Sequence, residues 1–153
     1  MEDKKKEGRY GRIYTQLSEL VLKSSSQSAR MATIVAVLHH KMEYFFWTGF
    51  YLIDKDKMTV NIYQGPVACQ ILKKNKGVCW AAFNKKESIV VEDVHLFPDH
   101  IACDSRSNSE IVVPFKNKAG EIIGVLDVDS SEKGSFSEVD AAWLEKIMEL
   151  IWV

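Results

Sequence analysis

The sequence predicts an α+β fold in which helices pack on an antiparallel sheet. Apolar residues recur at helical spacing near both ends of the chain, whereas β-branched and aromatic runs occupy the middle. Two pairs of these runs are joined by short polar turns, which indicates hairpins. Strands and helices do not alternate regularly, as they would in a parallel sheet.

Two helices are expected before the first strand. Residues 1–8 are polar, and we expect them to be disordered. Apolar side chains then follow helical spacing over residues 10–21. The serine-rich residues 24–28 end this helix and provide a cap for the next, which we place at residues 29–43.

The middle of the chain predicts a hairpin followed by a less regular region. Residues 45–53 and 58–64 read as two strands around a polar turn. An irregular loop carrying Cys69 comes next, and residues 77–83 are predicted to form a short helix. A third strand is expected at residues 88–92. Side chains alternate along a strand, so Phe45, Trp47, Gly49 and Tyr51 should share one face, while Phe46, Phe50 and Leu52 should face the helices.

A long polar loop, a second hairpin and a final helix complete the chain. The loop covers residues 93–109 and carries Cys103. Residues 111–115 and 121–129 predict the hairpin strands. Residues 136–140 open the last helix, with a serine at the cap and acids in the first turn.

Composition excludes several classes of protein. The 153 residues suit one domain, and a net charge of −1 provides no general attraction to nucleic acid or anionic membranes. The longest aliphatic run, residues 34–38, is far shorter than the roughly 20 residues that span a bilayer. Residues 4–6 are basic but no apolar run follows, so no secretory signal is recognised and we expect a cytoplasmic protein.

The three cysteines, Cys69, Cys79 and Cys103, leave several interpretations open. An odd count without an export signal argues against a structural disulfide framework. Counting alone favours small buried side chains. A zinc site that adds His95 or His100 lacks the usual close pair of ligands. A reactive thiol is the third interpretation, because polar loop residues surround Cys103.

A set of short segments in the sequence supports the interpretation of Cys103 as a reactive thiol. They are residues 64–69 (QGPVAC), 77–79 (GVC), 93–94 (DV), 97–98 (FP), 100–104 (HIACD) and 109–114 (SEIVVP), together with residues 47–51 (WTGFY) and 124–129 (GVLDVD). With the order and spacing of the cysteines, this pattern resembles the free methionine-(R)-sulfoxide reductases, which are stand-alone GAF domains. The resemblance runs from about residue 10 to the last helix.

The resemblance implies one GAF domain over residues 1–153, with a central antiparallel sheet of five to six strands and the N- and C-terminal helices on one face. It implies reduction of free L-methionine-(R)-sulfoxide through a cysteine sulfenic acid and an intramolecular disulfide. Thioredoxin would reopen that disulfide with electrons from NADPH, and neither a metal nor an organic cofactor is expected. A homodimer is a further expectation, because the last helix has an apolar face and Trp152.

The resemblance also assigns roles to individual residues. Cys103 is the expected attacker, and Cys69 and Cys79 remain alternative resolving thiols. Strand alternation puts Asp127 and Asp129 on one face, where Glu110 would join them. We assign Glu110 and Asp129 to the sulfoxide oxygen and Asp127 to the substrate ammonium. The expected substrate-binding residues are Trp47, Tyr51, Asp127, Ile101 and Ala102.

Alternatives remain for these assignments. Acids at such positions can be a solvated strand edge, and aromatic residues on a strand are more often core. A GAF domain can also be a small-molecule sensor without catalysis. The chain departs from the usual family pattern at Trp80 and Asp99, where glycine is common. Trp80 would either narrow the pocket or fill core.

Overall fold

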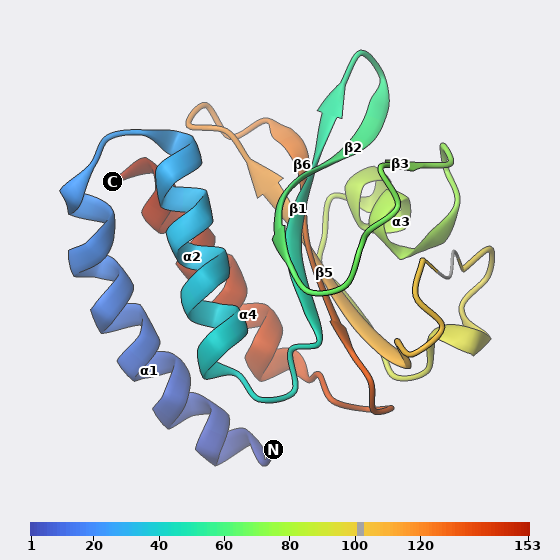
Figure 1. Ribbon diagram of the computed structural model, residues 1–153, viewed down its shortest axis with the longest axis horizontal. Helices are drawn as coiled ribbons and strands as arrows, with labels where there is room; N and C mark the ends of the chain where they lie inside the picture. The colour runs from blue at the N-terminus through green and yellow to red at the C-terminus, as the bar shows by residue number, and fades with distance from the viewer. Residues whose placement is uncertain (101–102) are drawn as a thin grey trace.

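Six strands form one antiparallel sheet in the order β3-β2-β1-β6-β5-β4. We describe it from a computed structural model, which describes residues 1–100 and 103–153 (Figure 1). The strands are β1 (Trp47–Asp54), β2 (Lys57–Gln64), β3 (Ile71–Leu72), β4 (Ile89–Val91), β5 (Ser109–Lys116) and β6 (Ile122–Ser130). The predicted antiparallel sheet is confirmed. The two-residue β3 was not predicted, because so short a pairing leaves no alternation in the sequence.

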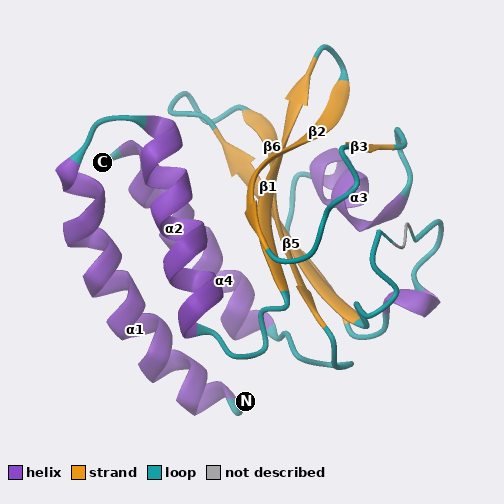
Figure 2. Ribbon diagram, in the orientation of Figure 1, coloured by secondary structure: helices purple, strands orange, loops and turns teal. Residues whose placement is uncertain are grey.

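The helices divide unequally between the two faces of the sheet. Three lie on one side of the sheet: α2 (Gln27–Lys41) and α4 (Glu138–Met148) pack against it, and α1 (Asp3–Leu20) packs on these two helices (Figure 1). The other face carries the short α3 (Gly77–Lys85) and long loops (Figure 2). Short 3-10 segments lie at Val21–Lys23, Val94–Leu96 and Glu149–Trp152. The prediction that the N- and C-terminal helices share one face is therefore confirmed.

Each face of the sheet has its own apolar core. Phe50 of β1, Ile111 of β5 and Leu126 of β6 are fully buried against the three long helices. Trp47 and Tyr51, on the opposite face, pack with α3 and its neighbours. The alternation of side chains thus separates a structural core from a second, smaller core that contains aromatic and polar groups.

The first turn of α1 corrects one expectation. Residues 1–8 were expected to be disordered, but α1 begins at Asp3 and Lys6 is 2 % exposed. The Lys6 ammonium pairs with Asp140 and also donates to the backbone oxygen of Ser135. Asp140 accepts from Tyr10 as well, and it closes the capping box that starts α4. This buried ion pair orders the first turn, and its members lie too far apart in the sequence to be recognised there.

The start of β1 corrects the expected orientation of two phenylalanines. Phe45 was expected to share a face with Trp47, and Phe46 to face the helices. Phe45 instead packs in the helix-side core, and Phe46 packs on the other face. The strand begins only at Trp47, and Phe45 belongs to a turn in which its N–H bonds to the carbonyl of Met42. Strand alternation does not apply to residues that precede the strand.

The apolar side of the last helix is used within the chain. Leu144 and Ile147 are fully buried in the helix-side core. Trp152 stacks on Phe115 with ring centroids 6.0 Å apart, and its indole N–H donates to the carbonyl of Lys116. This apolar face is therefore no reason for a dimer, and the homodimer stays a prediction for sedimentation to test.

Candidate active site

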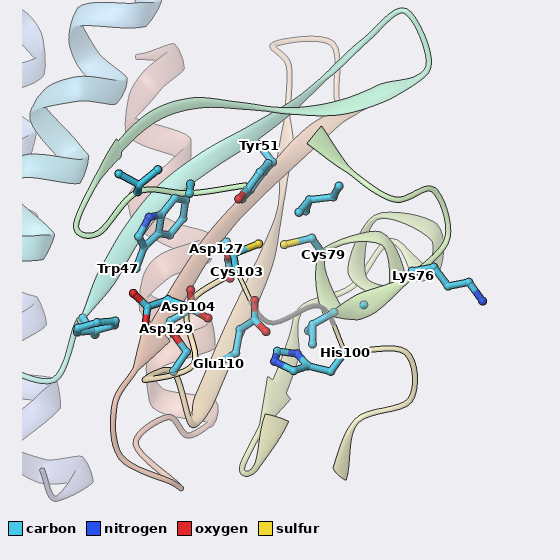
Figure 3. Close-up of a pocket in the computed structure, with 17 residues that line it drawn as sticks. Trp47, Tyr51, Lys76, Cys79, His100, Cys103, Asp104, Glu110, Asp127 and Asp129 are labelled. Atoms are coloured by element: carbon cyan, nitrogen blue, oxygen red, sulfur yellow. The ribbon is translucent and has the colours of Figure 1, made fainter. Parts of the chain in front are cut away.

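Three carboxyl groups converge on the face of the sheet that α3 and the loops cover. Pairing of β5 with β6 sets Glu110 opposite Asp129, and pairing of β1 with β6 sets Asp127 opposite Gly49. Asp127 and Asp129 are two residues apart on β6 and therefore point to the same side. All three line one pocket (Figure 3). The predicted grouping of these acids is confirmed by the strand register.

Burial changes the protonation of this cluster. Glu110 and Asp127 are each 6 % exposed. Desolvation, followed by the charges of the neighbouring acids, raises the pKa of Glu110 well above its usual value. Desolvation likewise raises the pKa of Asp129. Desolvation also raises the pKa of Asp127, to about 6, and hydrogen bonds from Glu110 and Cys79 oppose this rise. Burial therefore favours the protonated form of Glu110 and Asp129, and Asp127 is the member of the cluster whose pKa rises least.

Asp127 also has an unused acceptor. Its Oδ1 is buried and has no hydrogen-bond partner among the described residues. A buried carboxylate oxygen without a donor is costly, so a ligand with an N–H or cationic group would satisfy it. The Cys79 sulfur and carboxylate oxygens of Glu110 and Asp127 lie within 4.8 Å of one another. This group contains no histidine, so in residues 1–100 and 103–153 the cysteine–histidine zinc set is not assembled.

The cysteines are not equivalent. Cys69 and Cys103 form a disulfide, with Cα atoms 5.5 Å apart, although 34 residues separate them in the chain. Cys79 keeps its thiol and is buried on α3. Burial, reinforced by the charge of Asp127, raises the pKa of Cys79 well above its usual value. A thiol that resists ionisation is a poor nucleophile, so the structure favours Cys69 over Cys79 as the partner of Cys103.

Trp47 and Tyr51 form an aromatic wall beside the acids. Their rings stack with centroids 5.7 Å apart, and both side chains are almost fully buried. Gly49 lies between them on the same face of β1, where an added Cβ would meet Tyr63 of β2 first and then the Trp47 ring, at 2.7 Å. The glycine therefore leaves the space into which the indole folds. The shared face predicted for the three residues is confirmed.

The same wall holds the loop that carries Cys69. The Trp47 indole N–H donates to the carbonyl of Pro66 over 3.0 Å, and the Tyr51 hydroxyl donates to the carbonyl of Cys69 over 3.2 Å. The loop that carries Cys103 is fastened separately, because Asn108 bonds to the backbone of Val94 and of Ser130. The two loops that carry the disulfide are thus held by different elements, one by β1 and the other by the backbone of Val94 and Ser130.

The pocket rim carries further charge. Asp104 accepts two hydrogen bonds from the Arg106 side chain, which hold its pKa near the low value of about 2. The Arg106 guanidinium lies over the Phe46 ring, 5.0 Å from its centroid. His100 lines the pocket, and its partial burial lowers its pKa. Ile101 and Ala102, both predicted to bind substrate, lie outside the described residues.

The comparisons with known proteins agree with this architecture. A GAF-domain model matches residues 18–153. The chain belongs to the GAF-domain family. It is 37 % identical over 139 residues to the free methionine-R-sulfoxide reductase of Escherichia coli, with 91 % of this chain and 84 % of that protein covered. It is 42 % identical to GAF domain-containing protein A of Dictyostelium discoideum, over 95 % of this chain and 92 % of that protein.

A solved structure is also similar to this GAF domain along most of the chain. The free methionine-R-sulfoxide reductase of Neisseria meningitidis, solved in complex with its substrate, superposes with a TM-score of 0.88. The two are 39 % identical, and the match covers 94 % of this chain and 86 % of that one. The GAF fold and the resemblance to the free methionine-R-sulfoxide reductases are both confirmed.

The two departures from the usual family pattern now have structural explanations. Trp80 is 3 % exposed, is not part of the pocket lining, and its indole N–H bonds to the carbonyl of Leu72. It therefore fills core behind the pocket. Asp99 has a φ of 57°, a left-handed conformation that glycine adopts at no steric cost, and its carboxylate lies 3.5 Å from the Lys76 ammonium.

Several lining residues of the GAF-domain pocket were not singled out from the sequence. They are Phe46, Val67, Ala68, Leu72, Lys76, Gly77, Val78, Asp104 and Ser107. Most belong to loops or to α3, where no strand periodicity marks an inward side. Lys76 points away from the acids (Figure 3). Finally, none of the described helices combines the length and apolarity that crossing a membrane requires.

Proposed function

We propose that this GAF domain reduces free methionine-(R)-sulfoxide to methionine. One observation carries the proposal: the carboxyl groups of Glu110, Asp127 and Asp129 share a pocket with Cys103, and Cys103 is paired with Cys69. The names of the related proteins in Escherichia coli and Neisseria meningitidis support the same substrate. A protonated acid, an anionic acid and a cysteine are the groups that this reaction needs.

The chemical step joins the thiol to the acid cluster. In the reduced protein, the Cys103 thiolate attacks the sulfoxide sulfur, and the sulfoxide oxygen takes a proton from Glu110 or Asp129. The oxygen passes to Cys103 as a sulfenic acid, and methionine leaves with its sulfur reduced by two electrons. The raised pKa values of Glu110 and Asp129 support this role, because only a carboxyl group that keeps its proton near neutral pH can donate it.

Substrate selection follows from the rest of the pocket. Asp127 is the charged member of the cluster, and its unpartnered oxygen suits the substrate ammonium. Trp47 and Tyr51 offer an apolar wall to the methylthio end. Because the ammonium would lie against a buried carboxylate, a blocked amino group should not fit. Peptide-bound methionine sulfoxide is therefore expected to be a poor substrate.

Recycling uses the second cysteine. The Cys69 thiol condenses with the sulfenic acid on Cys103, forming the disulfide and releasing water. An external dithiol then reduces the disulfide, and thioredoxin supplied by NADPH and thioredoxin reductase is our expected donor. Neither a metal nor an organic cofactor is required by these steps.

A single-turnover experiment tests the proposal. Fully reduced protein is mixed with one equivalent of free L-methionine-(R)-sulfoxide, and methionine and intact protein mass are followed together. We expect one methionine per chain, a loss of two hydrogens and a new Cys69–Cys103 disulfide by peptide mapping. Cys103→Ser should form no methionine, whereas Cys79→Ser should complete the turnover. Methionine formation by Cys103→Ser would refute the assignment.

The second candidate is a GAF-type sensor that binds a small molecule without chemistry. It predicts saturable binding of the sulfoxide with no methionine, no change in mass and no NADPH consumption when thioredoxin and its reductase are added. N-acetylated, C-amidated methionine sulfoxide is the matched control substrate. Equal turnover of this blocked compound would contradict the role proposed for Asp127.

A further inference from the structure

An exposed patch next to Cys69 lies outside the groups that hold the substrate. Val67 and Ile71, two residues to either side of Cys69, are 84 % and 52 % exposed. Lys73 and Lys74 follow after the buried Leu72 and are also exposed. Exposed apolar and basic side chains around a cysteine that forms a disulfide distinguish this surface from an ordinary solvated loop.

The same segment is an open edge of the sheet. β3 is the outermost strand and pairs only with β2, through Ile71 opposite Thr59. The carbonyl of Gln70 accepts from the backbone N–H of Val60 over 2.8 Å, so the backbone groups of Gln70 face β2. Backbone groups alternate in direction along a strand, and those of Ile71 therefore face away from the sheet. An exposed edge of this kind can pair with an extended segment of another protein.

We propose that the open edge of β3, with Ile71, Lys73 and Lys74, is the docking surface for the protein dithiol that reduces the Cys69–Cys103 disulfide. The proposal rests on the proposed function, and it adds the place and the mode of contact. A segment paired with β3 would bring a partner thiol next to Cys69. The disulfide gives the reason for a protein to dock here, since Cys69 is half-buried and a thiol must be guided to it.

The exchange balances in two steps. The partner thiolate attacks the Cys69 sulfur, the Cys69–Cys103 bond breaks, and Cys103 leaves as a thiolate. The second partner thiol then attacks the mixed disulfide, releasing Cys69 and forming the partner's own disulfide. Two electrons pass to this chain, and Cys103 is returned directly to its nucleophilic form.

Charge indicates the kind of partner. Within residues 1–100 and 103–153, neither Lys73 nor Lys74 belongs to an ion pair, whereas Lys76 lies 3.5 Å from Asp99. Uncompensated positive charge beside a docking site accelerates encounter with an acidic protein, and salt screens this effect. The partner is therefore expected to carry acidic groups around its dithiol.

The test measures reduction of the disulfide itself, so it does not depend on methionine sulfoxide turnover. Oxidised protein is mixed with reduced thioredoxin or with dithiothreitol, samples are acid-quenched, and the disulfide is quantified by mass spectrometry. For Ile71→Glu we expect the second-order rate constant with thioredoxin to fall about tenfold or more, because an apolar contact is lost and a charge is buried. The rate with dithiothreitol should stay within about twofold, because a small thiol needs no docking surface.

Matched variants separate docking from general damage. Leu22→Glu places the same charge on an exposed apolar residue of the helical layer and should leave both rates unchanged. Ile71→Val keeps the apolar side chain and should behave as the wild type. Lys73→Glu with Lys74→Glu should slow thioredoxin and weaken the salt dependence, whereas Lys118→Glu, on the β5–β6 turn, should not.

An unchanged thioredoxin rate in Ile71→Glu would overturn the docking surface, even if the wild type reduces methionine sulfoxide. An equal loss with thioredoxin and dithiothreitol would overturn it too, because the disulfide itself would then have changed. The proposed function fails separately, through the absence of methionine in the single-turnover experiment.

Discussion

The pH dependence of stability can show whether Glu110 keeps its proton in the folded protein. Burial raises its folded-state pKa, whereas in the unfolded chain it ionises near the usual value of about 4.3. Between these two pKa values the folded state binds one more proton than the unfolded state. The free energy of unfolding then falls as pH rises, by about 1.4 kcal/mol per pH unit for one retained proton.

Glu110→Gln isolates this contribution, because glutamine resembles the protonated carboxyl in shape and in its capacity to donate. The difference in unfolding free energy, variant minus wild type, should be small near pH 4 and should grow as pH rises, by up to about 1.4 kcal/mol per pH unit until the folded-state pKa is reached. The lowered pKa values of His39 and His100 act in the opposite direction, since they favour folding as pH rises. They cancel in the difference because both proteins contain them.

Urea titrations at half-unit intervals from pH 4.5 to 8 provide the measurement, with the exposed Glu87→Gln as a control whose difference should not vary with pH. In the single-turnover assay the same Glu110→Gln protein should form methionine about 10² to 10⁴ times more slowly, the usual contribution of a general acid. A variant that is more stable and less active would connect the strain of the cluster to its function. A pH-independent difference would show that Glu110 ionises normally, and its role as proton donor would then be wrong.

Three further outcomes test other parts of the structure. Gly49→Ala should push β2 away at Tyr63 and displace the Trp47 ring, because the added carbon would meet both residues. KM for the sulfoxide should rise and indole fluorescence should shift; an unaltered spectrum and KM would contradict the packing. Asp127→Asn should weaken binding of free methionine sulfoxide by about 1.5–3 kcal/mol, the usual value of a hydrogen bond to a charged group. Turnover of a methionine sulfoxide analogue in which hydrogen replaces the amino group should stay unchanged. Lys6→Met should lower the free energy of unfolding in urea by about 3–5 kcal/mol, because Asp140 would be left buried without its cation; a loss below about 1 kcal/mol would mean that the first turn of α1 contributes little.

Much of the acid cluster could be predicted from local patterns. Asp127 and Asp129 share a face because strand side chains alternate, and the same rule joins Trp47, Gly49 and Tyr51. Such rules depend only on neighbours in the sequence. They fail one residue beyond a strand, as Phe46 shows, because the bend before Trp47 reverses the expected side.

The pairing of cysteines was beyond local reasoning. Cys69 and Cys79 are both at plausible distances in sequence from Cys103, and the choice depends on how two loops fold over the sheet. Bonds from β1 to the carbonyls of Pro66 and Cys69 bring one loop into place, and no sequence pattern announces them. In the structure Cys79 stays buried on α3 beside the acids, and Cys103 is paired with Cys69.

The hydrogen bonds from Trp47 and Tyr51 to the Cys69 loop affect which substitutions the loop can tolerate. The side chains of Trp47 and Tyr51 donate hydrogen bonds to backbone carbonyl oxygens, which every amino acid possesses. Replacement of Pro66 should therefore leave its carbonyl available to Trp47, whereas loss of either ring should release one attachment of the Cys69 loop. The two hydrogen bonds that hold this loop thus require the rings of Trp47 and Tyr51 but no particular side chain on the accepting residues.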